Sequence, residues 1–335
     1  MGRCPFCNIW QMKSEPLPLA QRLSLLKEIS EIGIRFVDFT GGEPLLCKEL
    51  PELLAEARRL GLTTSVTTNC VLYPQRHEEL LGLVDFLAFS LHGSTAPAHE
   101  AVLGIPCFDR LLESVKLAKS SGELLNLHAT ATAQNIADLP AMARLAQELQ
   151  VPLAVFPEFA YCGNTGLDSS LLAQLKQVGK LPGVYLNLAS VKIAAAGGNQ
   201  ISKPVCRGIN GAIAITPEGG LAIPCFHQMK HALPIVGQLA KVMADPMISE
   251  ANLKGAGRLP FCQGCQNWCY LNTSLANKAS YLAMLQNWST VRRYKAVANR
   301  SGHSVLHGLS FLRKPKPARR AEGNPETLPD NAPSR

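Results

Sequence analysis

Segments with helical periodicity alternate with short apolar segments along residues 18–165, and this alternation restricts the possible folds more than any other feature of the sequence. Apolar residues three and four apart predict helices at residues 18–32, 48–60, 76–83, 108–120 and 139–149. Between them we expect strands at residues 34–40, 62–68, 84–91, 124–132 and 151–156. The strands are apolar on both faces (FVDF, FLAFSL), as in a parallel sheet covered by helices. The sequence therefore predicts an α/β fold, either a barrel or a doubly wound sheet.

The pattern changes after residue 163. A helix at 171–178 and a further strand at 184–188 are expected first. Residues 206–270 are rich in Cys, Gly and Pro, and the turn residues at 217–220 predict a hairpin over 212–223. A helix is expected at 274–298, and the composition of residues 313–335 is typical of a disordered tail.

The formal net charge of +8 does not indicate a nucleic-acid-binding face. Residues 291–335 carry ten basic and three acidic residues, so the remaining 290 residues, with 23 basic and 22 acidic, are nearly neutral. No apolar run reaches the roughly 20 residues that a membrane-spanning helix needs, and the N-terminus does not resemble a signal peptide. We expect a soluble cytoplasmic protein that binds no nucleic acid.

The chain has 11 cysteines, and seven of them fall in two clusters, at residues 4–7 and 206–269. Clustered cysteines without a secretory signal indicate metal binding rather than disulfides. The first cluster, Cys4-Pro5-Phe6-Cys7, is compatible with zinc, redox or iron–sulfur chemistry. The other four cysteines, which we expect to be buried small hydrophobic residues, are Cys47, Cys70, Cys107 and Cys162.

A second motif, FTGGEPLLC, occupies residues 39–47 at the end of a predicted strand. Two adjacent glycines allow the backbone to approach a ligand closely, and Glu43 offers a carboxylate to an amino group. Taken alone, the motif is equally compatible with a simple tight turn.

Together, the two motifs resemble the radical S-adenosylmethionine (SAM) superfamily. That family has C-x3-C-x2-C with an aromatic residue before the last Cys, here Phe6, and GGEP at the end of the second strand, here residues 41–44. Further matches follow in order: TTN at 67–69, SLHG at 90–93, Asn135, and Gly-Asn at 163–164. Cys70 stands where the family often has Gly after TTN.

The resemblance implies a partial (β/α)6 TIM-like barrel with its site at the carboxyl ends of the strands. It also implies a [4Fe–4S] cluster that leaves one iron open to chelation by SAM. Cys4 and Cys7 would be two of its ligands. The residues that the resemblance places against the cofactors are Phe6, Gly41, Gly42, Glu43, Pro44, Asn69, Ser90 and Asn135. His92 is a candidate to face the substrate.

One departure concerns the first ligand. The first Cys of the family motif would fall one residue before Met1, and the family's first strand would also lie upstream. Two thiolates alone would hold a cluster poorly. We therefore expect Met1 to be an internal methionine, with the core truncated at its N-terminus. Genuine loss of the ligand, in a SAM-binding pseudoenzyme, is the alternative.

The C-terminal cluster has the spacing C-x13-G-x4-C followed by C-x2-C-x3-C. Zinc is the physical rival, because four thiolates suit it equally. The spacing resembles the SPASM and twitch domains that follow radical SAM cores, and a single auxiliary [4Fe–4S] cluster of the twitch kind fits better than two. The candidate ligands are Cys206, Cys225, Cys262, Cys265 and Cys269, of which the first four are preferred and Cys269 is the spare.

We thus expect five parts: a radical SAM core (1–165), a connecting segment (166–200), a cluster-binding domain (201–275), a helical segment (276–312) and a basic tail (313–335). The expected function is reductive SAM cleavage and hydrogen abstraction from a peptide or small polar molecule. A flavodoxin- or ferredoxin-like protein would supply electrons, and the auxiliary cluster would aid oxidation or substrate binding. A non-catalytic zinc or iron–sulfur scaffold is the alternative from another class.

Overall fold

The computed structural model describes residues 2–277, except residues 162, 164, 230, 247 and 249–254. The predicted tail, Cys162, Asn164 and most of the helix predicted at 274–298 therefore lie outside the described residues. A six-stranded parallel sheet forms the centre, with its strands in the order β1-β2-β3-β4-β5-β6. The strands are β1 (Phe36–Phe39), β2 (Thr63–Thr68), β3 (Phe86–Ser90), β4 (Leu125–Ala131), β5 (Leu153–Pro157) and β6 (Val184–Leu186).

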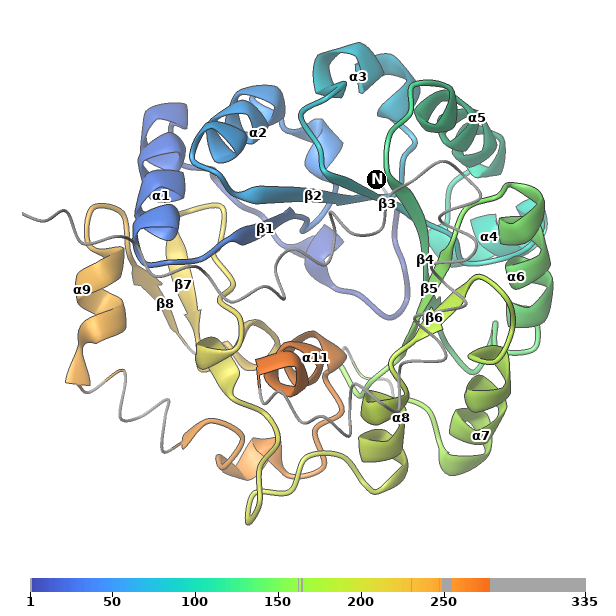
Figure 1. Ribbon diagram of the computed structural model, residues 1–335. Helices are drawn as coiled ribbons and strands as arrows, with labels where there is room; N and C mark the ends of the chain where they lie inside the picture. The colour runs from blue at the N-terminus through green and yellow to red at the C-terminus, as the bar shows by residue number, and fades with distance from the viewer. Residues whose placement is uncertain are drawn as a thin grey trace, which may run out of the picture.

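The strands are neighbours in chain order, and helices cover the outer side of the arc that they form (Figure 1). A doubly wound sheet would instead reverse its strand order and carry helices on both faces. The fold is therefore the partial barrel of the two predicted alternatives. Its helices are α1 (Leu19–Glu31), α2 (Leu50–Arg59), α3 (Tyr73–Leu80), α4 (Ala96–Leu103), α5 (Phe108–Ser120), α6 (Leu139–Glu148), α7 (Ser169–Val178) and α8 (Leu188–Ala195).

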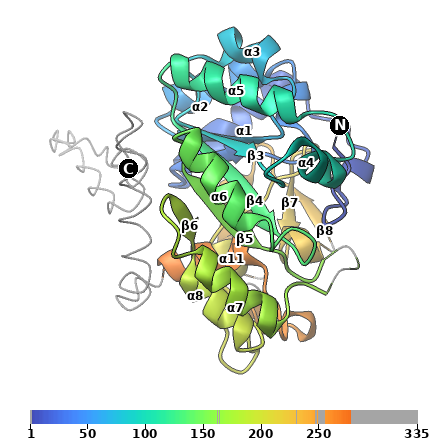
Figure 2. The ribbon, with the colours of Figure 1, turned by 90° about the vertical axis from the view of Figure 1, so that its right-hand side faces the viewer.

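Alternation along each strand separates two faces of the sheet. In β3, the side chains of Leu87 and Phe89 are fully buried in the main hydrophobic core, which α3, α5 and α6 complete. Figure 2 shows α5, α6 and α7 side by side across this outer face. The opposite, inner face of β1 to β4 carries polar residues, among them Asp38, Thr67 and Ser90.

The C-terminal segment lies between the two edges of the sheet, beside α1 and α8 (Figure 1). It contains β7 (Gly220–Ile223), β8 (His231–Pro234), α9 (Leu239–Ala244) and α11 (Trp268–Asn277). A second hydrophobic core joins α1 and α2 to this hairpin and α9. Glu28 of α1 strengthens the contact, because its carboxylate accepts hydrogen bonds from the backbone N–H groups of Gly237 (2.8 Å) and Leu239 (2.9 Å).

The hairpin predicted at 212–223 is displaced along the chain. Thr216 and Gly220 do close the expected turn, with the Thr216 N–H donating to the Gly220 carbonyl at 2.8 Å. Beyond it, residues 212–216 pair with β7 only through the isolated bridge between Ile215 and Leu221. The full ladder of β7 is with β8, on its other edge. Three short helices, α4, α8 and α9, were also not predicted.

Candidate functional site

Glu43 is a buried polar residue at the carboxyl ends of the strands. It follows β1 in the GGEP loop, where Gly41 has a φ of +129°, a conformation that residues with a Cβ rarely adopt. Its carboxylate accepts hydrogen bonds from the Leu45 N–H (3.0 Å), the Thr68 hydroxyl (2.5 Å) and the Asn69 N–H (2.9 Å). These bonds fix the loop after β1 against the end of β2. Burial raises the pKa of Glu43, and the three hydrogen bonds oppose that rise.

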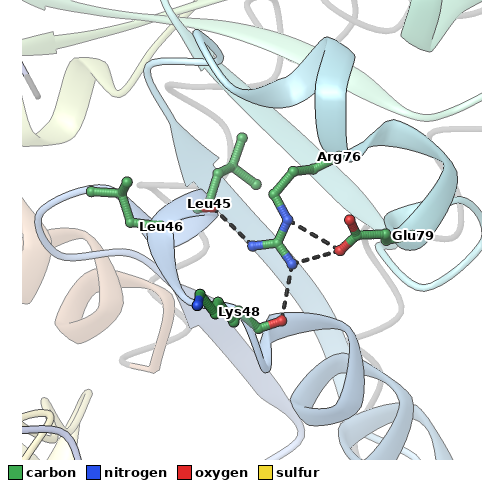
Figure 3. A pocket seen from close by; sticks show the side chains of 5 residues that line it. All are labelled: Leu45, Leu46, Lys48, Arg76 and Glu79. Carbon is green, nitrogen blue, oxygen red and sulfur yellow. Dashed lines mark hydrogen bonds and ion pairs between the residues drawn. The ribbon is translucent and has the colours of Figure 1, made fainter.

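Arg76 of α3 holds the same loop from outside the barrel (Figure 3). Its guanidinium donates to the carbonyls of Leu45 (2.8 Å), Cys47 (2.5 Å) and Lys48 (3.0 Å), and pairs with Glu79 at 2.7 Å. An open pocket of about 290 Å³ lies here, lined by Leu45, Leu46, Lys48, Arg76 and Glu79. Arg76 therefore positions the residues that directly follow Glu43 and Pro44.

The N-terminal cysteine loop lies at the same end of the sheet. The Cys7 N–H donates to the Cys4 carbonyl at 3.2 Å, which closes a tight turn around Phe6. The Phe6 ring meets His92, just after β3, edge to face at a centroid distance of 5.4 Å. Burial raises the pKa of the Cys4 thiol to about 11, and the charges of Cys7 and Cys107 add to that rise. The two thiols of the motif are thus neighbours, and they remain protonated unless a metal displaces the protons.

Three other predicted cofactor residues, Asn69, Ser90 and Asn135, also lie at or just after the carboxyl ends of the strands. Ser90 is half-buried at the end of β3. The Asn69 side-chain oxygen accepts from the Val71 N–H at 3.1 Å. Asn135 is buried, and its amide NH2 donates to the carbonyls of His92 (3.3 Å) and Thr130 (2.9 Å). Asn135 therefore ties the loop after β3 to the end of β4.

Four of the five C-terminal cysteines come together. Burial raises the pKa of the Cys206 thiol to about 11, and the charges of Cys265, Cys262 and Cys225 each raise it further. The charges of Cys265 and Cys262 likewise raise the pKa of Cys225, and the charge of Cys265 raises that of Cys262. Every pair among the four thiols therefore interacts. We call this set the cysteine quartet. Within the described residues, no three His, Cys, Asp or Glu side chains gather as closely as a single metal ion requires.

Cys269 lies apart from the quartet, at the start of α11. Its thiol has a pKa of about 12, first because it is buried and also because of the charge of Asp38 on β1. Of the other cysteines, Cys70 and Cys107 are buried, as predicted, whereas Cys47 is only half-buried.

Asn199 joins the segments of three quartet cysteines, and the sequence did not predict this role. Its buried side chain donates to the carbonyls of Gly257 (2.7 Å) and Cys262 (3.1 Å) and accepts from the N–H of Cys206 (3.2 Å). Its backbone N–H donates to the Cys265 carbonyl at 2.8 Å. One side chain and its backbone thus contact the segments of three cysteines. The Gly-rich run before it was the only sequence signal.

Comparison with known proteins agrees with this geometry. Residues 1–146 match the Radical SAM superfamily. This chain carries a radical SAM domain. The match contains the Cys4–Cys7 loop, the GGEP loop and the ends of β2 to β4.

Curated relatives of the radical SAM domain carry different names. PqqA peptide cyclase of Gluconobacter oxydans (strain 621H) is 30% identical over 152 residues, which are 44% of this chain and 42% of that protein. Fe-coproporphyrin III synthase of Methanosarcina barkeri is 30% identical over 145 residues, 42% of this chain and 36% of that protein. A probable GTP 3',8-cyclase of Sulfurisphaera tokodaii is 28% identical over 249 residues, 68% of this chain and 78% of that protein. The chain spans less than half the length of the first two.

Solved structures share the fold over most of the chain. Streptococcus suis SuiB bound to precursor peptide SuiA has a TM-score of 0.59 at 16% identity, covering 83% of this chain and 70% of SuiB. Native anSMEcpe with bound AdoMet and Cp18Cys peptide has a TM-score of 0.59 at 14% identity, covering 90% and 95%. At these identities the likeness shows the fold alone. Among the described residues, no helix is both long and apolar enough to cross a bilayer.

Proposed function

We propose that this chain is a radical SAM enzyme that acts on a peptide or a small polar molecule. The observation that carries the proposal is that the Cys4–Cys7 loop and Glu43 both lie at the carboxyl ends of the strands, inside the matched domain. Sulfur donors at the same end of the sheet as a buried, preorganised carboxylate suit an iron–sulfur cluster and the amino group of SAM. When bound, these cofactors supply reductive cleavage of SAM and abstraction of a hydrogen atom from the substrate.

The residues of this chain would bind and orient those cofactors. Cys4 and Cys7 would give up their protons to hold iron, and Phe6 would cover the cluster beside His92. Glu43 would accept a hydrogen bond from the amino group of SAM. Its bonds to Thr68 and Asn69 keep the carboxylate in place before SAM arrives. The remaining residues proposed to line the SAM site are Gly41, Gly42, Pro44, Asn69, Ser90 and Asn135.

The cysteine quartet would hold an auxiliary [4Fe–4S] cluster. Its fit rests on the donor set, four thiols that each lie close enough to the other three to interact electrostatically. A zinc ion would need four thiolates at about 2.3 Å from one point, and among the described residues no three metal-binding side chains gather as closely as a single ion requires. The larger cluster therefore fits the quartet better. When bound by the quartet, such a cluster would supply an electron acceptor or a binding site for the substrate.

A peptide is the favoured substrate because a peptide is named for PqqA peptide cyclase and is present in the SuiB and anSMEcpe structures. The flavodoxin- or ferredoxin-like electron donor and the cytoplasmic location remain predictions, as do the domain boundaries.

Glu43→Gln tests the proposed SAM site. Replacing the carboxylate by an amide should weaken SAM binding by about 1.5–3 kcal/mol, roughly 10- to 150-fold, because a charge-assisted hydrogen bond is lost. Equilibrium dialysis of SAM against the anaerobically reconstituted protein would measure the change. Glu78→Gln, an exposed carboxylate on the outer helix α3, is the matched control and should bind SAM as the wild type does. Equal SAM affinity in Glu43→Gln and the control would contradict the proposal.

A further inference from the structure

The inner face of the sheet has an unusual distribution of charge. None of the six strands contains Lys or Arg, and neither do the four residues after each strand. The same positions carry three carboxylates, those of Asp38, Glu43 and Glu158. Since Glu43 is assigned to SAM above, Asp38 and Glu158 are left for other partners.

The histidines at this face add no positive charge near neutral pH. Burial lowers the pKa of His92 to about 3 and that of His128 to about 4. Both rings are therefore neutral and can accept or donate a hydrogen bond. An anionic group placed here would meet two carboxylates and no counter-charge from the strands.

Asp38 is the carboxylate best placed to meet a ligand. Solvent reaches its side chain, although protein atoms surround it and raise its pKa. The Thr67 hydroxyl donates to it at 3.2 Å, and Ser65 supplies a second hydroxyl donor. A carboxylate offers about four acceptor positions, so two hydroxyl donors leave capacity for further N–H or O–H groups.

Helix α11 lies over the inner face of the sheet (Figure 1). Trp268 stacks on Phe156 of β5, with ring centroids 4.2 Å apart and an interplanar angle of 19°. The next residue is Cys269, and the charge of Asp38 on β1 contributes to the raised pKa of its thiol. Two consecutive residues of α11 thus reach β5 and the edge strand β1.

We propose that the substrate group that reaches the inner face of the sheet beside α11 is neutral or positively charged, and that Asp38 accepts a hydrogen bond from its N–H or O–H donor. This inference rests on the proposed function, which locates the reaction at the inner face of the sheet. An amine-, amide- or hydroxyl-bearing segment flanked by apolar or aromatic groups fits this surface, whereas a polyphosphate does not.

The thiol of Cys269 provides a reporter that does not depend on SAM cleavage. We would label the reconstituted protein with cystamine, whose tail is cationic, or with 3,3'-dithiodipropionate, whose tail is anionic. Peptide mass spectrometry would give the labelling rate at Cys269. We expect the cationic disulfide to react faster by about two- to fivefold, as for a partly solvated charge pair. Asp38→Asn should remove this preference. Any general change in thiol reactivity cancels in the ratio of the two rates.

Cys47 serves as the internal control, since its rate ratio should be the same in wild type and Asp38→Asn. GTP, named for one relative, is the polyanionic probe, and it should not protect Cys269 from cystamine. A preference for the anionic disulfide, a preference that survives Asp38→Asn, or protection by GTP would each overturn the proposal. A chain that fails to cleave SAM yet gives the expected ratios would refute only the proposed function.

Discussion

Asn199 shows how much of the segment that carries the cysteine quartet depends on one side chain. Its amide satisfies two carbonyls and two N–H groups that would otherwise be buried without partners. Gly198, with a φ of +79°, brings the chain close to Gly264, where a Cβ would lie 2.2 Å from the carbonyl oxygen. The segments of Cys206, Cys262 and Cys265 are therefore held in place before any metal binds.

Asn199→Asp should destabilise this arrangement, because a carboxylate cannot donate to the carbonyls of Gly257 and Cys262. We expect a loss of about 1–3 kcal/mol in unfolding free energy and a lower iron content after reconstitution. Urea unfolding and iron analysis measure the two effects. Asn210→Asp, at an exposed position, is the control and should change neither. Wild-type stability together with full iron content in Asn199→Asp would show that the amide does not organise the quartet.

Each strand of the sheet was predictable, whereas several contacts that build the site were not. The strands at 62–68 and 124–132 were recognisable because both of their faces avoid solvent, and the structure has them at Thr63–Thr68 and Leu125–Ala131. Helix α4 was missed because it spans only Ala96–Leu103 and its start depends on a cap, in which Thr95 accepts from the Ala98 N–H. Asn199 and Arg76 could not be assigned, because their partners lie 58 and 31 residues away along the chain.

Arg76 links helix α3 to the loop that follows Glu43. Arg76→Ala removes three charge-assisted bonds to carbonyls and should weaken SAM binding several-fold by loosening that loop. Arg76→Lys, which retains a charge but can reach fewer carbonyls, should give an intermediate affinity. SAM dialysis at a temperature where both variants remain folded checks this.

Arg110→Ala, which breaks an exposed ion pair on α5, is the control for that measurement. It should leave SAM binding unchanged. If Arg76→Ala binds SAM as tightly as Arg110→Ala, then α3 does not position the loop.

The whole molecule should lose stability as the pH falls. His92 and His128 titrate near 3 and 4 when folded, below their ordinary pKa of 6.5, because burial disfavours the charged ring. The unfolded chain therefore takes up protons first, so stability is complete above about pH 6.5 and falls as the pH drops toward 4. At pH 5, each such histidine costs about 2 kcal/mol relative to pH 7.

The unfolding free energy lost between pH 7 and pH 5 should be about 2 kcal/mol smaller in His128→Gln than in the wild type. Urea midpoints of wild type and variant at the two pH values measure it. An identical loss in both proteins would mean that His128 is not buried as a neutral ring.

Formation of 5′-deoxyadenosine tests the central claim most directly. The anaerobically reconstituted protein, given SAM and dithionite, should release 5′-deoxyadenosine, slowly even without substrate. Replacing Cys262 and Cys265 by Ala should leave this release measurable, because the Cys4–Cys7 loop and Glu43 belong to the barrel and not to the quartet. Glu43→Gln should lower it at limiting SAM. No 5′-deoxyadenosine from wild-type protein that spectroscopy shows to carry a cluster at Cys4 and Cys7 would contradict the assignment as a radical SAM enzyme.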